Sequence, residues 1–332
     1  MAHEIETFAY TGEEPWHGLG FRVDGDLTPE EMMKAAQLDW AVKKVPLYFP
    51  WEPNEDGVLV MKRAHGSSLL VRDSDQKVLS LVGDDWQENQ NEDIFEFFNE
   101  YCEAGDMTME TAGSLRDGKF VFCLAKLNKN FELVIGDKVD GYVLMCSPHA
   151  YGYRFTIQYT GIRVVCKNTL VYSLREGPLA GTQAFRMTHR RKFDDEAKKE
   201  ARETLGLAVK QFEWFKNASE VLAAARMEYE QRIDFFKKVA KIDETENVED
   251  DDEPEELPRR VQQFEYVYEE APGQQLSSAK DTIWGAVNAV TYTVDHVLGR
   301  SRDTAMYNAW LGQNAAMKRR AVSLGLELAK AA

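Results

Sequence analysis

The chain has 332 residues, of which 44% are hydrophobic and 29% are charged, so it is long and apolar enough to bury a sizeable core. Its net charge of −16 argues against a protein that coats duplex DNA or a membrane over its whole surface. No run of about 18 apolar residues predicts a membrane span, and no apolar run near the N-terminus resembles a signal peptide. We therefore expect a cytoplasmic protein that does not bind membranes.

The first hundred residues predict two short helices and several short strands. Thr28 as the cap, Pro29 as the first helical residue and Glu31 as the partner in a capping box mark the start of the first helix. Apolar residues between 94 and 102 recur at helical spacing, and Asn91 is the expected cap of this second helix. Short β-rich runs occupy 41–49, 58–63, 68–71 and 78–82.

The strongest strand signal follows these elements. Two β-rich runs, Met107–Leu115 and Lys119–Leu127, flank Arg116-Asp117-Gly118, which is typical of a hairpin turn. Three further runs extend the predicted antiparallel sheet, at 142–146, 153–159 and 162–166.

The character of the sequence becomes helical after Lys192. Residues 193–241 are rich in Ala, Glu, Lys and Arg, with apolar residues three or four apart and an expected break at Asn217–Ser219. Ten of the fourteen residues from Asp243 to Glu256 are acidic, which predicts a solvated loop. Apolar seams at 283–297 and 307–328 predict further helices.

Together these patterns predict an α+β fold, with an antiparallel sheet and flanking helices in the first half and a helical C-terminal half. The expected domain organisation is an α+β domain at 1–192, a long helical segment at 193–242, an acidic flexible loop at 243–258, and a C-terminal helical segment at 259–332 that packs on the rest.

Residues 141–192 differ from the rest of the chain in charge. They contain eight basic side chains and one acidic one, a local charge of +7 within a chain of −16. Seven Tyr and Phe side chains are interleaved with the cations. Cations and flat rings on a strand scaffold are typical of proteins that bind single-stranded nucleic acid. The alternative is that the arginines pair with surface acids and the rings fill the core.

Two clusters within this basic stretch are the preferred phosphate contacts. Four cations fall within 186–192, at a helix entrance where the helix dipole disfavours positive charge unless an anion binds. Asn168 is the expected cap of a helix whose free amides would receive a phosphate beside Lys167. The structural alternative for 186–192 is a solvated basic turn. The structural alternative for Asn168 is a helix cap that binds no ligand. The candidate nucleic-acid contacts are Arg154, Arg163, Lys167, Asn168, Arg186, His189, Arg190, Arg191 and Lys192, with Tyr151, Tyr153 and Tyr159 as candidate stacking rings.

The sequence contains no motif for catalysis or for cofactor binding. Walker A, GxGxxG and HExxH patterns are absent, and the four cysteines form no CxxC pair. Cys146 and His149 form an isolated C-x-x-H without a second ligand pair. We therefore expect no catalytic residues, no cofactor and no metal site, and we expect the chain not to be an enzyme.

Three motifs that stand in order along the chain resemble a known family. They are PWHGLG at 15–20, RVVCKNTL at 163–170, and TIWGAVNAVT at 282–291 with Asp295-His296 after it. The chain resembles, over nearly its whole length, the phage/plasmid-like protein family described as domain of unknown function 932. This resemblance implies a mobile-element protein in a bacterial host and carries over no catalytic residues. A fainter likeness is to Rad52-like single-strand annealing proteins, which also place an antiparallel sheet before a long helix.

The leading hypothesis is a non-enzymatic phage or plasmid protein that binds single-stranded DNA through a basic, aromatic-lined groove. In this hypothesis it acts in annealing or recombination as a homo-oligomer. One alternative is a protein-interaction module that regulates or blocks a host factor. The other is a metal-dependent nuclease.

Overall fold

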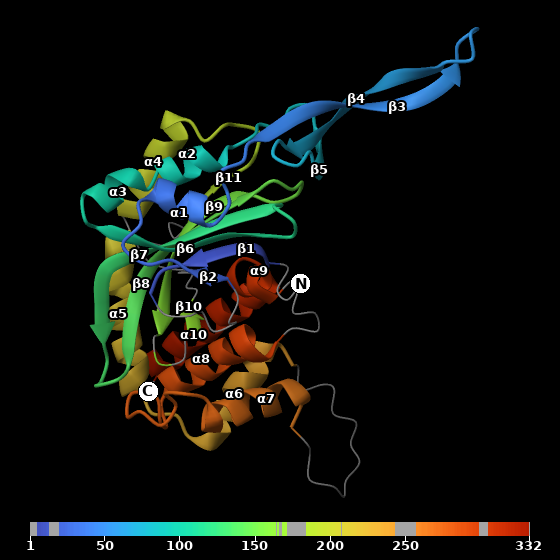
Figure 1. Ribbon diagram of the computed structural model, residues 1–332. Coiled ribbons are helices and arrows are strands. Elements are labelled where there is room, and N and C mark those ends of the chain that lie inside the picture. The colour runs from blue at the N-terminus through green and yellow to red at the C-terminus, as the bar shows by residue number, and fades with distance from the viewer. Residues whose placement is uncertain are drawn as a thin grey trace, which may run out of the picture. The chain divides into compact units, whose positions relative to one another are not determined.

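The structure is a computed structural model that describes residues 5–12, 20–163, 165, 168–170, 184–206, 208–242, 257–298 and 305–331. The side chains at 163, 168–170, 208–211 and 305–307 are outside this description, as is the predicted acidic loop except for its last two residues. The fold class is confirmed: the protein is α+β, with an antiparallel sheet and with most of its helices in the C-terminal half (Figure 1).

The strands form two sheets. The larger sheet has the order β10-β9-β8-β7-β6-β1-β2, with β11 also paired to β9. The β1–β2 pair is parallel, whereas β1–β6, β6–β7, β9–β10 and β9–β11 are antiparallel. The smaller sheet, β3-β4-β5, is antiparallel. The strands are β1 (Ile5–Tyr10), β2 (Phe21–Arg22), β3 (Val42–Pro53), β4 (Leu59–Arg72), β5 (Val78–Gly83), β6 (Met107–Leu115), β7 (Phe120–Glu132), β8 (Lys138–Pro148), β9 (Phe155–Arg163), β10 (Asn168–Leu170) and β11 (Ala184–Met187).

The helices divide between the two halves of the chain. They are α1 (Pro29–Ala35), α2 (Asn91–Glu96), α3 (Asn99–Glu103), α4 (Asp195–Gly206), α5 (Ala208–Ala224), α6 (Tyr229–Ala240), α7 (Arg259–Glu270), α8 (Ile283–Tyr292), a π-helical turn (Thr293–Val297), α9 (Ala305–Trp310) and α10 (Gln313–Ala331). No helix in the described ranges is both long enough and apolar enough to cross a membrane.

The chain forms two compact units that are interleaved along the sequence. Unit 1 comprises 1–128, 143–158 and 184–204, and unit 2 comprises 129–142, 159–183 and 205–332. Strands β7, β8 and β9 contribute residues to both units, so consecutive sequence ranges do not describe the division.

Several local predictions are confirmed. Thr28 caps α1 and forms the capping box with Glu31. The hairpin turn between β6 and β7 is also present, and Arg116, Asp117 and Gly118 have φ angles of 53°, 58° and 84°. These left-handed angles explain the choice of Asp and Gly in the turn.

Three other local predictions are wrong. Asn91 does not cap α2, because its amide nitrogen donates to the carbonyls of Leu38 and Trp40. Helix α5 continues through Asn217–Ser219, and the next helix break lies instead at 225–228. Asn168 caps no helix, since it begins strand β10 and pairs with Arg163 of β9.

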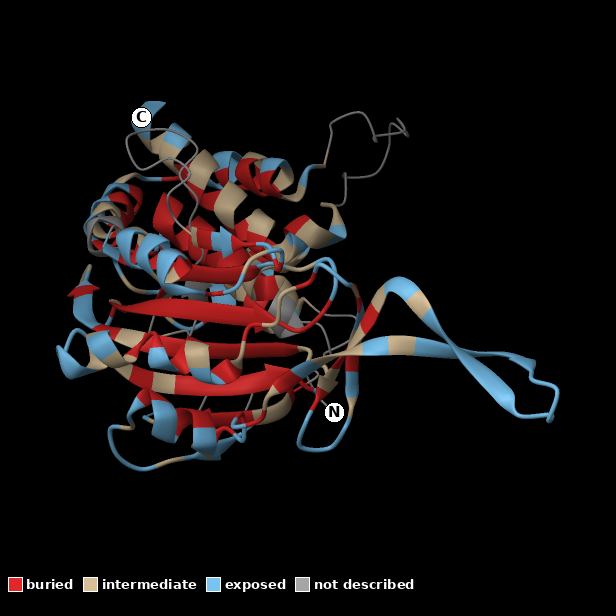
Figure 2. Ribbon diagram, turned by 90° about the horizontal axis from the view of Figure 1, so that it is seen from above, coloured by how far each residue is buried: buried red, intermediate tan, exposed pale blue. Residues whose placement is uncertain are grey.

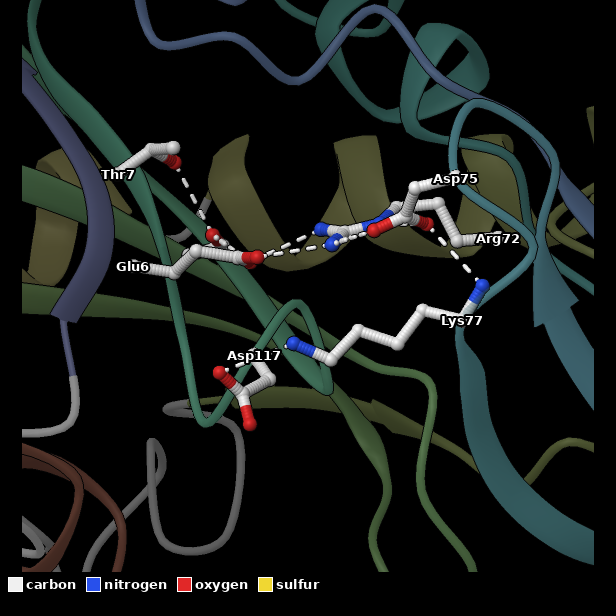
Figure 3. Close-up of polar contacts among 7 residues, drawn as sticks. Glu6, Thr7, Arg72, Asp75, Lys77 and Asp117 are labelled. Carbon is white, nitrogen blue, oxygen red and sulfur yellow. Dashed lines mark hydrogen bonds and ion pairs between the residues drawn. The ribbon is translucent and has the colours of Figure 1, made fainter.

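In unit 1, the guanidinium of Arg72 joins the smaller sheet to strand β1 (Figure 3). Its Nη1 and Nη2 donate to Glu6 at 2.9 and 2.8 Å, and its Nε and Nη2 donate to Asp75 at 2.9 and 2.6 Å. Ser114 of β6 donates to the same Glu6 carboxylate at 3.1 Å. The hydrogen bonds from Arg72 lower the pKa of Asp75 to about 2. Because Arg72 is buried, the two carboxylates supply the partners that a buried charge requires.

The β3–β4 arm, residues 47–66, extends outward from the rest of unit 1 (Figure 2). Every residue from 48 to 63 is exposed to solvent. Strand β5 pairs with β4 only at 67–71, so the outer part of β4 is covered on one edge by β3 alone. The arm therefore contributes little to the core of unit 1.

In unit 2, helix α8 is the centre of the hydrophobic core. Every residue from 283 to 291 is buried, and the helix contacts α5, α7, α10 and β10. The Trp284 indole Nε1 donates to Asp137 at 3.1 Å, and Thr282 caps the helix by accepting from the Gly285 amide. The predicted apolar seam at 283–297 is thus intrachain core up to Val294, whereas Val297 is exposed.

Gly285 of helix α8 packs closely against the turn that precedes the helix. A Cβ at this position would lie 2.0 Å from the carbonyl oxygen of Ala279, which is backbone and cannot move aside easily. We expect Gly285→Ala to lower the free energy of unfolding by about 2 kcal/mol or more, as overpacking in a core does. The measurement is urea denaturation. Gly206→Ala is the matched control, because that helical glycine has open space around it and its substitution should leave stability unchanged or slightly raised. Equal effects of the two changes would contradict this account.

Candidate nucleic-acid interface

The structure brings several predicted contacts to one end of the β9–β11 pair in unit 1. Met187 pairs with Phe155 at the end of the ladder, and Arg186 pairs with Thr156. Arg154 immediately precedes β9, and the segment 188–192 immediately follows β11. We call the surface formed by Tyr151, Arg154, Arg186, Arg190 and Lys192 the β9–β11 end. Its members come from two stretches of sequence, 151–154 and 186–192, which the antiparallel β9–β11 pairing places together.

The cations of this end are accessible to solvent. Arg154, Arg186 and Lys192 are exposed and make no ion pair with any other described residue. Arg190 lies 3.7 Å from Asp85, with both side chains largely exposed. Surface pairs of this kind contribute little, so Arg190 remains available to another anion.

Arg191 is more firmly engaged than its neighbours. Its Nη1 and Nη2 donate to the same carboxylate oxygen of Glu200 at 3.0 and 3.1 Å. The alternative in which the arginines pair with surface acids therefore holds for Arg191, and we leave Arg191 out of the β9–β11 end.

Tyr151 is the exposed ring of this surface, at 71% of its full accessibility. It lies in the turn between β8 and β9, where Gly152 has a φ of 87° and the Tyr151 amide donates to Ser80 of β5. Its ring centroid is 6.5 Å from that of Trp86, which stacks on His189 at 4.1 Å with an interplanar angle of 6°. Three rings thus lead from the interior of unit 1 to solvent.

The other predicted stacking rings and His189 are less accessible to a ligand than Tyr151 is. Tyr159 is buried, and burial raises the pKa of its hydroxyl. Tyr153 is half-buried against Phe120, with ring centroids 4.7 Å apart. His189 is buried beneath Trp86. The prediction that Tyr159 and His189 contact a ligand directly is therefore corrected, because the core covers both side chains.

His189 instead fixes the position of the basic segment. The backbone carbonyl of His189 accepts from the Gln87 amide at 2.7 Å, and the Phe193 amide donates to the Asn89 side chain at 2.9 Å. The loop that carries Trp86 and Asn89 therefore holds both ends of the segment that contains Arg190 and Lys192.

A second buried histidine lies near the first. His149 Nε2 is 3.0 Å from Asn91 Oδ1, and because the Asn91 amide nitrogen donates to two carbonyls, Nε2 carries the proton. The Trp40 ring packs edge-on against His149 at 5.4 Å. Burial lowers the pKa of His149 to about 3 and that of His189 to about 4, so both rings are neutral near pH 7.

The remaining predicted contacts are not part of the β9–β11 end. Arg163 and Asn168 belong to unit 2, and their side chains are outside the described atoms. Lys167 lies outside the described residues. Residues Asn168–Leu170 form strand β10, so Asn168 caps no helix and the prediction of a phosphate site at a helix terminus there is corrected.

Sequence reasoning missed Trp86, the ring that connects Tyr151 to the interior. The sequence places Trp86 after two acids and between a strand and a helix, which gives no signal of stacking.

No group of three or more His, Cys, Asp or Glu side chains that could hold a metal ion is present within the described parts of the chain. Exposed cations can bind phosphates, and an exposed aromatic ring beside them can stack on a base.

A family model described as Domain of unknown function (DUF932) matches residues 78–321. The chain belongs to this family. No curated protein and no solved structure matches it, so the fainter likeness to Rad52-like proteins has no support from known structures. Within the DUF932 region, the motif TIWGAVNAVT at 282–291 supplies the N-cap Thr282 and nearly all of the core helix α8. Close packing in the core accounts for the Gly and the Trp of this motif.

Because two histidines are buried, we expect the free energy of unfolding to fall in mild acid. The unfolded chain binds a proton on each ring near pH 6.5, whereas the folded chain resists protonation until about pH 4 and pH 3. The unfolded state thus holds more protons below pH 6.5, and stability is lost as the pH falls, by about 1.4 kcal/mol per pH unit for each histidine. We expect His149→Gln to reduce this slope between pH 6 and 4.5, measured by urea denaturation at a series of pH values. The exposed His65→Gln is the control and should leave the slope unchanged.

Proposed function

We propose that this protein binds single-stranded DNA at the β9–β11 end of unit 1 and performs no catalysis there. The observation that carries the proposal is the combination of a ring exposed to solvent, Tyr151, with three exposed cations that make no ion pair with any other described residue. These cations are Arg154, Arg186 and Lys192. Phosphate contacts supply affinity without reading sequence, and a flat ring stacks on any base. This chemistry fits a single strand, whose bases are accessible, better than a duplex.

The charge of the whole chain supports a confined binding surface. The protein carries −16 overall, so the acidic remainder repels a polyanion and favours contact only where cations collect. Arg154, Arg186, Arg190 and Lys192 are the proposed phosphate contacts. Trp86 and His189 support the Tyr151 ring and the basic segment from beneath.

The proposed biological setting follows from the phage/plasmid-like family resemblance. The protein acts in the cytoplasm of a bacterial host, as a homo-oligomer encoded by a mobile element. Several copies along one strand would hold its bases exposed, and annealing or recombination is the activity to test.

Charge reversal at the β9–β11 end tests the phosphate contacts. We expect Arg154→Glu with Arg186→Glu to weaken binding to an oligothymidine by about 10- to 100-fold at low salt, because two phosphate contacts are lost. The slope of log affinity against log salt should become shallower by about 1.4, which is about 0.7 for each contact on a single strand. Fluorescence anisotropy across a salt series measures both.

The matched control reverses two exposed cations elsewhere. Lys129→Glu with Lys330→Glu changes the net charge of the chain by the same amount, and both residues are exposed in unit 2. Equal weakening by the two double variants would show that only total charge matters and would contradict the proposed surface. Affinity of the unmodified protein that does not fall with salt would contradict DNA binding altogether.

Tyr151 is expected to act by stacking and not by charge. Tyr151→Ala should weaken binding by about 5- to 150-fold, which corresponds to about 1–3 kcal/mol for one stacked base, and should leave the salt slope unchanged. Tyr151→Phe keeps the flat ring and should retain most of the affinity. If Phe and Ala weaken binding equally, the ring does not stack on a base. The same anisotropy assay decides between these outcomes.

A further inference from the structure

The β3–β4 arm exposes apolar side chains on both of its faces. Alternate residues of a strand point to opposite faces, so Phe49, Trp51 and Val60 lie on one face and Tyr48 and Met61 on the other. Phe49 and Trp51 contact each other with centroids 5.8 Å apart, and Lys62 lies 4.3 Å from the centroid of the Trp51 ring. Val58 and Leu59 extend this apolar surface toward the tip.

This surface is large for a segment that has no core to cover it. The residues Tyr48, Phe49 and Trp51 are 51%, 38% and 48% exposed, which leaves on the order of 300 Å² of accessible surface on these three residues. Four aliphatic side chains add to it, and the apolar area is divided between the two faces of the arm.

The two edges of the arm differ in their capacity to accept another strand. Strand β3 contains Pro46, Pro50 and Pro53, which lack the N–H group that a neighbouring strand requires. The outer part of β4, residues 59–66, contains no proline and is not paired to β5. Strand addition is therefore favoured at β4.

The charges along the arm select the orientation of the added strand. The tip carries three acids, Glu52, Glu55 and Asp56, and the stem side of β4 carries Lys62, Arg63 and His65. An antiparallel pair of identical arms places each acidic tip beside the basic stem of the other copy. A parallel pair would place acid against acid, which is unfavourable.

We infer that the β3–β4 arm is a self-association surface, through which strand β4 of one copy pairs antiparallel with strand β4 of a second copy. The contact is isologous, because the same residues act on both sides of a two-fold axis. It gives the oligomer that forms part of the proposed function a defined surface. It does not depend on DNA binding, and its test contains no nucleic acid.

Analytical ultracentrifugation of the full chain tests the association. We expect a dimer at micromolar concentration, and Leu59→Asp with Met61→Asp should raise its dissociation constant by roughly 100-fold, because charges would be buried in the contact. Both residues are exposed in a single copy, so circular dichroism and thermal unfolding should remain unchanged. Ile135→Asp with Val221→Asp is the matched control, since these apolar residues are exposed in unit 2 and should not affect the dimer.

A pair of charge variants tests the antiparallel orientation. Variant one carries Glu55→Lys and Asp56→Lys, and variant two carries Lys62→Glu and His65→Glu. Arg63 is left in place because it contacts Asp84 of its own chain at 3.4 Å. Each variant alone should dimerise at least about tenfold more weakly, because tip and stem then have the same sign. Mixed together, the two should form a heterodimer, since each tip again meets a stem of opposite sign.

Three results would overturn the inference. A wild-type chain that stays monomeric across the micromolar range would refute self-association. A dimer that survives Leu59→Asp with Met61→Asp would place the interface elsewhere. Failure of the two charge variants to associate when mixed would refute the antiparallel arrangement. Loss of DNA binding in the separate assay changes none of these results.

Discussion

The buried guanidinium of Arg72 is the interaction on which the architecture of unit 1 depends. It lies at the end of β4, forms two hydrogen bonds with Glu6 of β1 and two with Asp75, and its charge is 5.3 Å from the Trp40 ring. A buried cation without partners is costly, so both carboxylates must be present together. This requirement couples the N-terminal strand to the base of an arm that has little hydrophobic support of its own. The polar contacts of Arg72 and the buried side chains of Val42 and Leu70 together hold the base, while the outer arm stays exposed to solvent.

The β9–β11 end shows a related division between a rigid interior and an accessible surface. His189 and Trp86 are buried and stacked, and Asn89 holds the backbone of the basic segment. Tyr151 and the cations are exposed on this support. Because burial lowers the pKa of both histidines, neither adds a positive charge to this surface near pH 7. Electrostatic attraction therefore resides in the exposed cations, where salt can screen it.

The two proposed surfaces of unit 1 use different physical forces. The β9–β11 end relies on charge and stacking, which suit a flexible polyanion. The β3–β4 arm relies on apolar area and strand pairing, which suit another polypeptide. Salt should weaken the first far more than the second, so the two activities are separable in solution. A protein with both surfaces can join copies of itself without using the residues that contact a ligand.

The sequence by itself determined the features that depend on neighbouring residues. The capping box of Thr28 and Glu31, the turn at Arg116–Gly118, the apolar seam of α8 and the α+β class were all readable, because their causes lie within a few positions along the chain. The charge contrast of 141–192 was equally visible. Only the tertiary structure decided which of these residues reach solvent. Asn91 binds two distant carbonyls in place of capping its helix, Tyr159 is buried while Tyr151 is exposed, and Trp86 joins a stack with a histidine about a hundred residues away. Strand β3 is rich in aromatic side chains, yet its outer half is exposed, since burial is set by partners far along the chain and not by the composition of the strand.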